Sequence, residues 1–141
     1  MRILGVDPGE KNIGIAMSDP TGSIASPFLV IKHESRPIDA ASIAEIARDH
    51  AVELIIVGQA LDHENNPTFS GRKAARLAAA IRTQTDIPVT LWDESHSTQT
   101  ARNAQIALGS ARRNRSGHLD ELAATVILQS YLDSESNSHT K

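Results

Sequence analysis

The chain has 141 residues, a length typical of one domain with one hydrophobic core. Hydrophobic residues make up 40% of it, which excludes an intrinsically disordered chain, and no apolar run approaches the ~18 residues that a membrane-spanning helix needs. We therefore expect no membrane partner. Cysteine is absent, which excludes disulfides, thiol catalysis and Cys-ligated zinc and fits a cytoplasmic location.

The net charge of −3 and the scarcity of aromatic residues limit how the chain could bind nucleic acid. A tight nucleic-acid binder usually has a strongly basic surface, and a base-stacking surface needs clustered aromatic rings. The two Phe, one Trp and one Tyr of this chain are spread along its length. Any contact with nucleic acid must therefore rest on locally clustered positive charge or on bound metal ions.

The first third of the chain predicts three short strands, at residues 3–7, 12–18 and 28–32. Pro8 and Gly9 interrupt the first apolar run, and the turn sequence at residues 19–22 follows the second. Connections this short favour antiparallel pairing, so we expect a meander.

The rest of the chain alternates between helical and strand patterns. Apolar residues at helical spacing indicate helices, and short continuous apolar runs indicate strands that are covered on both faces. The expected elements are, in order, a helix with Pro37 in its first turn, a strand at 53–58, a helix capped by Ser70, a strand at 88–92, a helix from Ser97 or Thr98 to Gly109, and a helix over 118–133.

This order, βββαβαβα, predicts an α/β fold with a five-stranded mixed sheet. Strands joined through helices prefer right-handed parallel crossovers, so the first, fourth and fifth strands should lie side by side, with helices on both faces of the sheet. We expect residues 1–133 to form a single domain. Residues 134–141 are polar, and we expect them to form a disordered tail.

Three acids occupy positions that suggest a binding site. Asp7 ends the first strand and Glu94 follows the fifth, so in a parallel arrangement both lie at the carboxyl edge, where open α/β sheets bind ligands. Asp120 begins the last helix in helical register with the apolar residues Ala124 and Ile127. Its side chain should therefore face the sheet.

Three carboxylates at one place repel one another unless a cation lies among them. Oxygen ligands favour Mg²⁺ or Mn²⁺ over zinc, and one or two such ions suit the hydrolysis of a phosphodiester by water. Asp7, Glu94 and Asp120 are therefore predicted to be both metal ligands and catalytic residues. The alternative interpretation of the residues alone is three acids that merely cap helices and turns.

Glycines follow the first of these acids, in the segment DPGEKNIGIA. Gly9 permits a tight turn beside Asp7, and Gly14 removes a side chain where backbone or substrate could approach. A similar loop holds phosphate in actin-like ATPases, but those proteins need two lobes and a much longer chain. A glycine hairpin that serves only the fold is the remaining alternative.

Four segments together resemble a known family: LGVDPGEKNIGIAMSD, IIVGQALDHENN, WDESHSTQTAR and HLDELAATVILQSYLD. They extend over nearly the whole chain and are similar to the YqgF/RuvX family in their residues and in the order of elements. The resemblance implies a ribonuclease H-like fold and a nuclease, either one that matures the 5′ end of 16S ribosomal RNA or a Holliday-junction resolvase. Matched by motif, the family's acidic triad falls on Asp7, Glu94 and Asp120.

The chain departs from the family pattern at two places. Ser95 and His96 follow the Asp-Glu pair where the family usually has Arg and an apolar residue, and Gln59 and Ala60 stand where it usually has Leu-Pro. Without this arginine, the chain lacks a group that would hold the substrate or orient a carboxylate. His96 is either a replacement phosphate contact or a plain surface residue.

Two basic clusters are candidates for binding nucleic acid. Arg112, Arg113 and Arg115 crowd the segment before the third acid, and we expect them to grip phosphates beside the metal site without reading base sequence. Arg72 and Lys73, at the start of the second predicted helix, are further candidates. For these two residues, a solvated helix face is the alternative.

The sequence thus predicts a cytoplasmic, metal-dependent endonuclease. On the resemblance, its substrate is structured RNA, above all precursor 16S ribosomal RNA, in preference to a four-way DNA junction. One alternative is a junction resolvase, which would need a homodimer to make paired cuts. The other is a catalytically silent binding module on the same fold, which the acidic charge and the missing arginine favour and the complete triad opposes.

Overall fold

The computed structural model describes residues 1–94 and 116–139, and it describes the side chains of the last helix over residues 122–136. The elements are β1 (Ile3–Pro8), β2 (Asn12–Ser18), β3 (Ala25–Lys32), α1 (Arg36–Asp49), β4 (Leu54–Gln59), α2 (Phe69–Arg82), β5 (Val89–Asp93) and α4 (Ser116–His139). All five predicted strands are present. The helix predicted from Ser97 or Thr98 to Gly109 lies outside the described residues.

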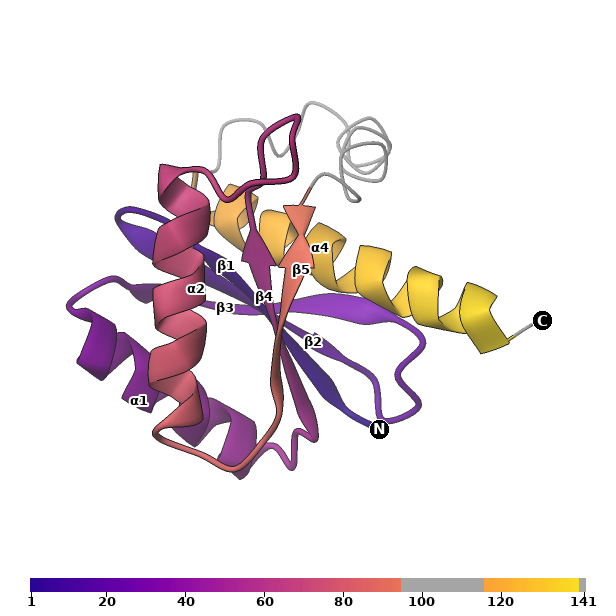
Figure 1. Cartoon of the computed structure of the whole chain (residues 1–141). Coiled ribbons are helices and arrows are strands. Elements are labelled where there is room, and N and C mark those ends of the chain that lie inside the picture. The colour runs from indigo at the N-terminus through magenta and orange to yellow at the C-terminus, as the bar shows by residue number, and fades with distance from the viewer. Residues whose placement is uncertain (95–115, 140–141) are drawn as a thin grey trace.

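The strands form one sheet in the order β3-β2-β1-β4-β5 (Figure 1). β1, β2 and β3 pair antiparallel through short connections and form the predicted meander. β1, β4 and β5 pair parallel, because helices connect β3 to β4 and β4 to β5. The predicted mixed sheet is therefore confirmed, and β1, β4 and β5 end together at one edge, which we call the carboxyl edge.

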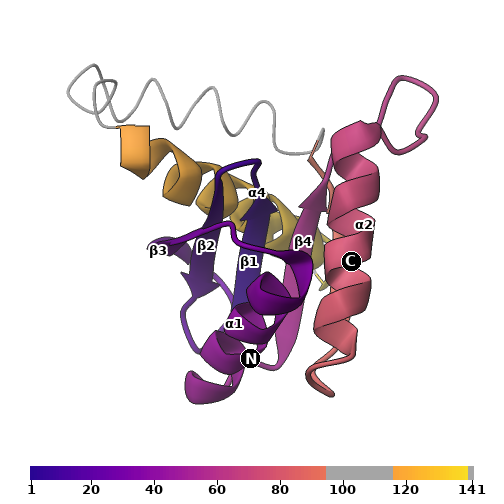
Figure 2. The ribbon, with the colours of Figure 1, turned by 90° about the vertical axis from the view of Figure 1, so that its left-hand side faces the viewer.

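Helices cover both faces of this sheet, as predicted, with α1 and α2 on one face and α4 on the other (Figure 2). Alternation along β1 divides its side chains between two hydrophobic cores. Leu4 and Val6 belong to the core under α1 and α2, whereas Ile3 belongs to the core under α4. Each position along β1 is thereby assigned to one face.

α4 packs very close to β1 because β1 has a glycine at the contact. A Cβ atom on Gly5 would lie only 2.7 Å from the Cβ of Leu128, so any larger residue would push the helix away. Further along α4, Gln129 accepts a hydrogen bond from the Ala25 N–H at 2.9 Å and donates one to the Ser23 carbonyl at 3.1 Å. These two bonds tie the later turns of α4 to the start of β3, away from the carboxyl edge.

The start of α2 differs from the sequence prediction, since Thr68 and not Ser70 caps the helix. The Thr68 Oγ1 accepts a hydrogen bond from the Gly71 N–H at 3.1 Å, and its own hydroxyl donates to the Ala60 carbonyl at 3.2 Å. The Thr68 N–H donates to the same carbonyl at 3.1 Å. Thr68 caps the helix because it bonds both to Ala60, which follows β4, and to the first turn of α2.

The end of α4 also differs from expectation. The helix continues through residues 134–139, where we expected a disordered tail. Neither glycine nor proline occurs there to end a helix. No helix in the described ranges is both long and apolar enough to cross a membrane.

Candidate active site

Asp7 lies near the end of β1, at the carboxyl edge. The alternation that directs Gly5 toward α4 places Asp7 on the α4 face, and its carboxylate is half-buried. Its direct partner on β2 is Gly14. Side chains of directly paired residues lie on the same face of a sheet, so residue 14 contributes no side chain beside the Asp7 carboxylate.

The turn after Asp7 requires a glycine for a steric reason. A Cβ atom on Gly9 would lie 2.3 Å from the Asn12 carbonyl oxygen, a distance that no side chain could tolerate. The geometry therefore matches the tight turn expected at this position. It also brings β2 back beside Asp7.

Glu94 follows β5 at the same edge and packs against Gly58 of β4. A Cβ atom on Gly58 would lie 3.2 Å from Glu94 Oε1 and 2.7 Å from Ile127 Cδ1 of α4. Because one direction from Gly58 meets both side chains, Glu94 lies on the α4 face. Asp7 and Glu94 thus share one face and one edge of the sheet; the sequence predicted the shared edge of their strands but not the shared face.

The environment of Glu94 disfavours its negative charge. Burial raises the pKa of the Glu94 carboxyl above its ordinary value, and the neighbouring Asp93 carboxylate raises it further. A divalent cation beside Glu94 would offset both effects. Carboxylate oxygens are also the ligands that a hard cation such as Mg²⁺ or Mn²⁺ prefers, so the residues present fit the predicted metal.

Asp120 belongs to the first turns of α4, but its side chain lies outside the described part of the chain. In Figures 1 and 2 α4 begins level with the carboxyl edge. Among the described side chains, no three His, Asp or Glu residues form a metal-binding group. Asp120 as the third ligand therefore stays a prediction. Further predicted site residues that lie outside the described residues are Ser95, His96, Arg112, Arg113 and Arg115.

The structure places Arg72 and Lys73 in the first turns of α2, on the opposite face of the sheet from Asp7 and Glu94 (Figure 2). The Arg72 guanidinium donates a hydrogen bond to the Pro67 carbonyl at 3.2 Å, and the Lys73 ammonium lies 4.7 Å from the centre of the Phe69 ring. These two cations are therefore not part of the Asp7–Glu94 cluster.

The position of α2 depends on Gln59, one of the departures from the family pattern. Its side-chain amide donates a hydrogen bond to the Gly71 carbonyl at 3.0 Å. A Cβ atom on Gly71 would lie 2.2 Å from the Ala60 carbonyl oxygen, so α2 can approach β4 this closely only with glycine there. Gln59 thus fastens the first turn of α2 to the end of β4.

A pair between the exposed His33 and the buried Asp39 at the start of α1 was not predicted from the sequence. His33 Nδ1 lies 2.5 Å from Asp39 Oδ2, and the Asp39 side chain is only 3% exposed. Asp39 Oδ1 accepts a hydrogen bond from the Glu34 N–H at 3.1 Å. One signal could have revealed the pair: Asp39 precedes the buried Ile43 by four residues, which puts an acid on the apolar face of the helix.

Comparisons with known proteins agree with this architecture. A family model for RuvX, described as "Holliday junction resolvase", matches residues 1–134. A protein of Caldanaerobacter subterraneus named "Putative pre-16S rRNA nuclease" is 38% identical over 98% of this chain and all of the relative. A protein of the same name from Desulforamulus reducens is 37% identical over 95% of this chain and 98% of the relative.

Solved structures share the fold. Thermus thermophilus RuvC in complex with a Holliday junction substrate matches with a TM-score of 0.62 at 18% identity, covering 96% of each chain. The fowlpox virus resolvase in complex with Holliday junction DNA matches with a TM-score of 0.58 at 14% identity, covering 96% of this chain and 99% of the resolvase. The predicted ribonuclease H-like fold is thereby confirmed.

The family model and the curated relatives both extend over nearly the whole chain, and the words that describe them denote nucleases. They confirm the resemblance found in the sequence and the prediction of a nuclease. This chain belongs to the RuvX family.

Proposed function

We propose that this protein is a metal-dependent endonuclease that processes precursor 16S ribosomal RNA. The observation that carries the proposal is the placement of Asp7 and Glu94 on one face of the carboxyl edge, with α4, the helix of Asp120, beginning at the same edge. The names of the curated relatives supply the substrate. The whole-length match to those relatives makes the inference from their names direct.

In the proposed site, Asp7, Glu94 and Asp120 hold one or two Mg²⁺ or Mn²⁺ ions. Such ions, when bound, polarise the phosphoryl group and make water a stronger nucleophile. Gly14 contributes no side chain beside Asp7 on β2, which leaves room on that side for a phosphodiester to approach the carboxylates. Hydrolysis would break the bond between phosphorus and the 3′ oxygen, leaving a 5′-phosphate and a 3′-hydroxyl.

Contacts to the rest of the substrate would come from positive charge. We propose that Arg112, Arg113 and Arg115 grip phosphates next to the cut, because they directly precede Asp120 in the chain. We assign Arg72 and Lys73 to a different part of the substrate, since α2 lies on the other face of the sheet. We also propose that the protein acts in the cytoplasm, where ribosome assembly takes place.

The test is cleavage of a precursor 16S RNA fragment and a four-way DNA junction, side by side, with Mg²⁺, Mn²⁺ or a chelator. Asp7→Asn should abolish cleavage, because the amide loses the charge that holds the cation. Asp86→Asn is the matched control, since Asp86 is an exposed acid before β5. Metal-dependent cutting of the RNA supports the proposal.

Cutting of the junction alone would instead establish a resolvase, which the family description favours. That result would also predict a homodimer in solution, since paired cuts need two copies of the site. No cutting of either substrate by folded protein would favour a silent binding module.

A further inference from the structure

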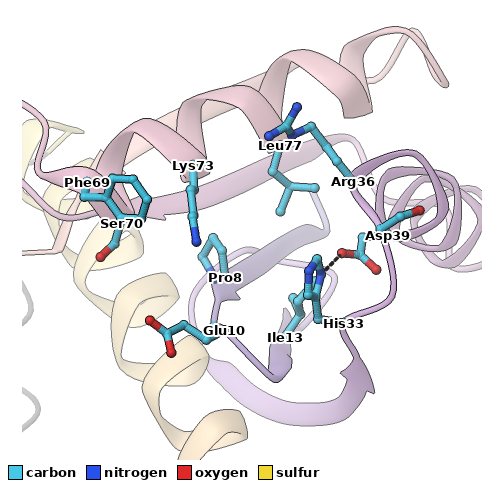
Figure 3. Close-up of a pocket in the computed structure, with 12 residues that line it drawn as sticks. Pro8, Glu10, Ile13, His33, Arg36, Asp39, Phe69, Ser70, Lys73 and Leu77 are labelled. Atoms are coloured by element: carbon cyan, nitrogen blue, oxygen red, sulfur yellow. Dashed lines mark hydrogen bonds and ion pairs between the residues drawn. The ribbon is translucent and has the colours of Figure 1, made fainter.

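A pocket of about 610 Å³ lies at the carboxyl edge, beside the turn after β1 (Figure 3). Pro8, which lines it, follows Asp7 in β1, so the pocket is on the face opposite to Asp7. Three segments far apart in the sequence form it: the turn after β1, the junction between β3 and α1, and the start of α2. Pro8, Ile13 and Leu77 contribute apolar surface to it. Its volume lies within the range of small-ligand pockets.

Two cationic side chains and one histidine belong to the polar lining of the pocket. Lys73 extends into it from α2, and Arg36 and His33 line it from the side of α1 (Figure 3). Neither Lys73 nor Arg36 has an ion-pair partner among the residues that the structure describes. Both α1 and α2 begin at the pocket, so the positive ends of two helix dipoles add to the cationic charge.

His33 is held in a fixed orientation at this pocket. Its Nδ1 is bound to Asp39, whose other oxygen accepts the Glu34 N–H. Because Nδ1 is engaged, Nε2 is the ring nitrogen that remains for a ligand. A buried carboxylate behind a half-exposed imidazole therefore preorganises one polar group of the pocket before any ligand arrives.

Phe69 adds an aromatic surface at the rim. It is 65% exposed, so a ligand in the pocket can reach the ring. Arg72 and Lys73 both lie over its ring, at 5.8 and 4.7 Å from the centre. An exposed ring flanked by cations suits a base that stacks while its phosphate is bound nearby.

Glu10 is the acid that limits which anion the pocket prefers. It lines the pocket together with Lys73 and Arg36 and offsets part of their charge, while the Asp39 carboxylate is already paired with His33. The two cations Lys73 and Arg36 are balanced by the carboxylates of Glu10 and Asp39, and this lining suits the single charge of a phosphodiester better than the double charge of a terminal phosphate.

The pocket also has a simple relation to the proposed active site. Pro8, which lines the pocket, directly follows Asp7 in the chain. Alternation along β1 directs the two side chains to opposite faces of the sheet. A strand crossing the carboxyl edge over the turn at Gly9 can therefore present one phosphate to Asp7 and place a neighbouring nucleotide in the pocket.

We propose that this pocket binds one unpaired nucleotide of the substrate strand, next to the phosphodiester that is cut, with its base on Phe69 and its phosphodiester held by Lys73, Arg36 and His33. The substrate is then a strand that is single-stranded on one side of the cut. This inference rests on the proposed nuclease function for its meaning, but binding to the pocket needs neither metal nor cleavage.

The first experiment measures binding of the dinucleoside monophosphate ApA to the full-length Asp7→Asn protein in a chelator, by amide chemical shifts in NMR. We expect shifts at Gly9, Ser35 and Ser70, and weaker binding of adenosine or inorganic phosphate alone. Lys73→Ala and Phe69→Ala should each weaken ApA binding by about fivefold or more. Arg76→Ala is the matched control, because Arg76 is an exposed cation of α2 that does not line the pocket.

The second experiment compares binding of a single-stranded RNA and the same RNA in a duplex to these proteins. We expect the single strand to bind more tightly and Phe69→Ala to remove most of that preference. Absence of shifts at the pocket amides, an equal loss in Arg76→Ala, or a preference for duplex would each overturn the proposal. Because no arm depends on cleavage, failure of the pocket is distinguishable from failure of the proposed nuclease activity.

Discussion

The Glu94 carboxylate lies directly against Gly58, with Oε1 3.2 Å from the position that a Cβ atom on residue 58 would occupy. The same Cβ would lie 2.7 Å from Ile127 Cδ1 of α4. One glycine therefore permits two contacts at once: the packing of α4 on β4 and the placement of a proposed metal ligand. The two roles can be separated by mutation.

Gly58→Ala should destabilise the fold by about 1–3 kcal/mol, because the new methyl group overlaps Ile127. Ile127→Val removes the Cδ1 atom that is overlapped. In the double variant, the loss of stability measured by urea unfolding should be clearly smaller than the sum of the two single losses. Nuclease activity should fall in Gly58→Ala and stay low in the double variant, since the Cβ of residue 58 crowds the Glu94 carboxylate in both. Strict additivity of the two losses would contradict the contact.

Glu94→Gln should raise the melting temperature of the metal-free protein at pH 7 to 8, by on the order of 1–3 °C. The raised pKa of Glu94 means that the folded protein binds this proton more tightly than the unfolded chain does. The ionised carboxylate therefore destabilises the fold increasingly as the pH rises from its ordinary value through the raised one. The difference between variant and wild type should vanish near pH 4.

The same raised pKa predicts how metal binding depends on pH. A proton and a divalent cation compete for the Glu94 carboxylate, so Mg²⁺ or Mn²⁺ affinity, measured by calorimetry, should fall at a higher pH than it would for an ordinary glutamate. Added metal should stabilise wild type and not Glu94→Gln. Glu53→Gln, which changes an exposed glutamate, should alter neither result.

Thr68→Ala should destabilise the protein by about 1 kcal/mol, because it removes the cap of α2 and the hydroxyl bond to Ala60. Ser70→Ala is the matched control and should have little effect. Thermal or urea unfolding of the two variants decides between the observed cap and the cap that the sequence suggested. A larger loss in Ser70→Ala would show that the helix begins later.

Asp39→Ala should cost about 1–3 kcal/mol of stability, because the Glu34 N–H and the His33 ring lose their buried acceptor. Asp39→Asn keeps one oxygen for the Glu34 N–H and should cost less. Urea unfolding measures both. Equal losses in the two variants would mean that the charge of Asp39, and not its hydrogen-bonding capacity, stabilises this junction.

The triple variant Arg112→Ala, Arg113→Ala and Arg115→Ala should bind RNA more weakly and with a flatter dependence on salt. Each lost phosphate contact should reduce the slope of log K against log salt by about 0.7–0.9. Arg48→Ala is the control, because Arg48 binds the Gln84 carbonyl, away from the carboxyl edge. An unchanged slope in the triple variant would remove these arginines from the interface.

The sequence by itself determined the order of strands and helices, the mixed sheet and the edge at which Asp7 and Glu94 lie. These follow from local patterns: Pro8 and Gly9 end a strand, and alternating helices impose parallel crossovers. The acids could be found for the same reason, since each occupies a recognisable end of an element. The start of α2 was placed wrongly because Ser70 and Thr68 are equally good caps until the Ala60 carbonyl is brought beside one of them.

Only the tertiary structure decided which side chains share a face and which segments form a cavity. The pocket joins Pro8, His33 and Lys73, whose proximity depends on the meander and on the crossover that leads to β4 and α2, and leaves no local periodicity in the sequence. The closeness of α4 to Gly5 and Gly58 likewise depends on contacts between distant parts of the chain. Short-range physics sets the elements, whereas the sites between them arise from packing that brings distant residues together.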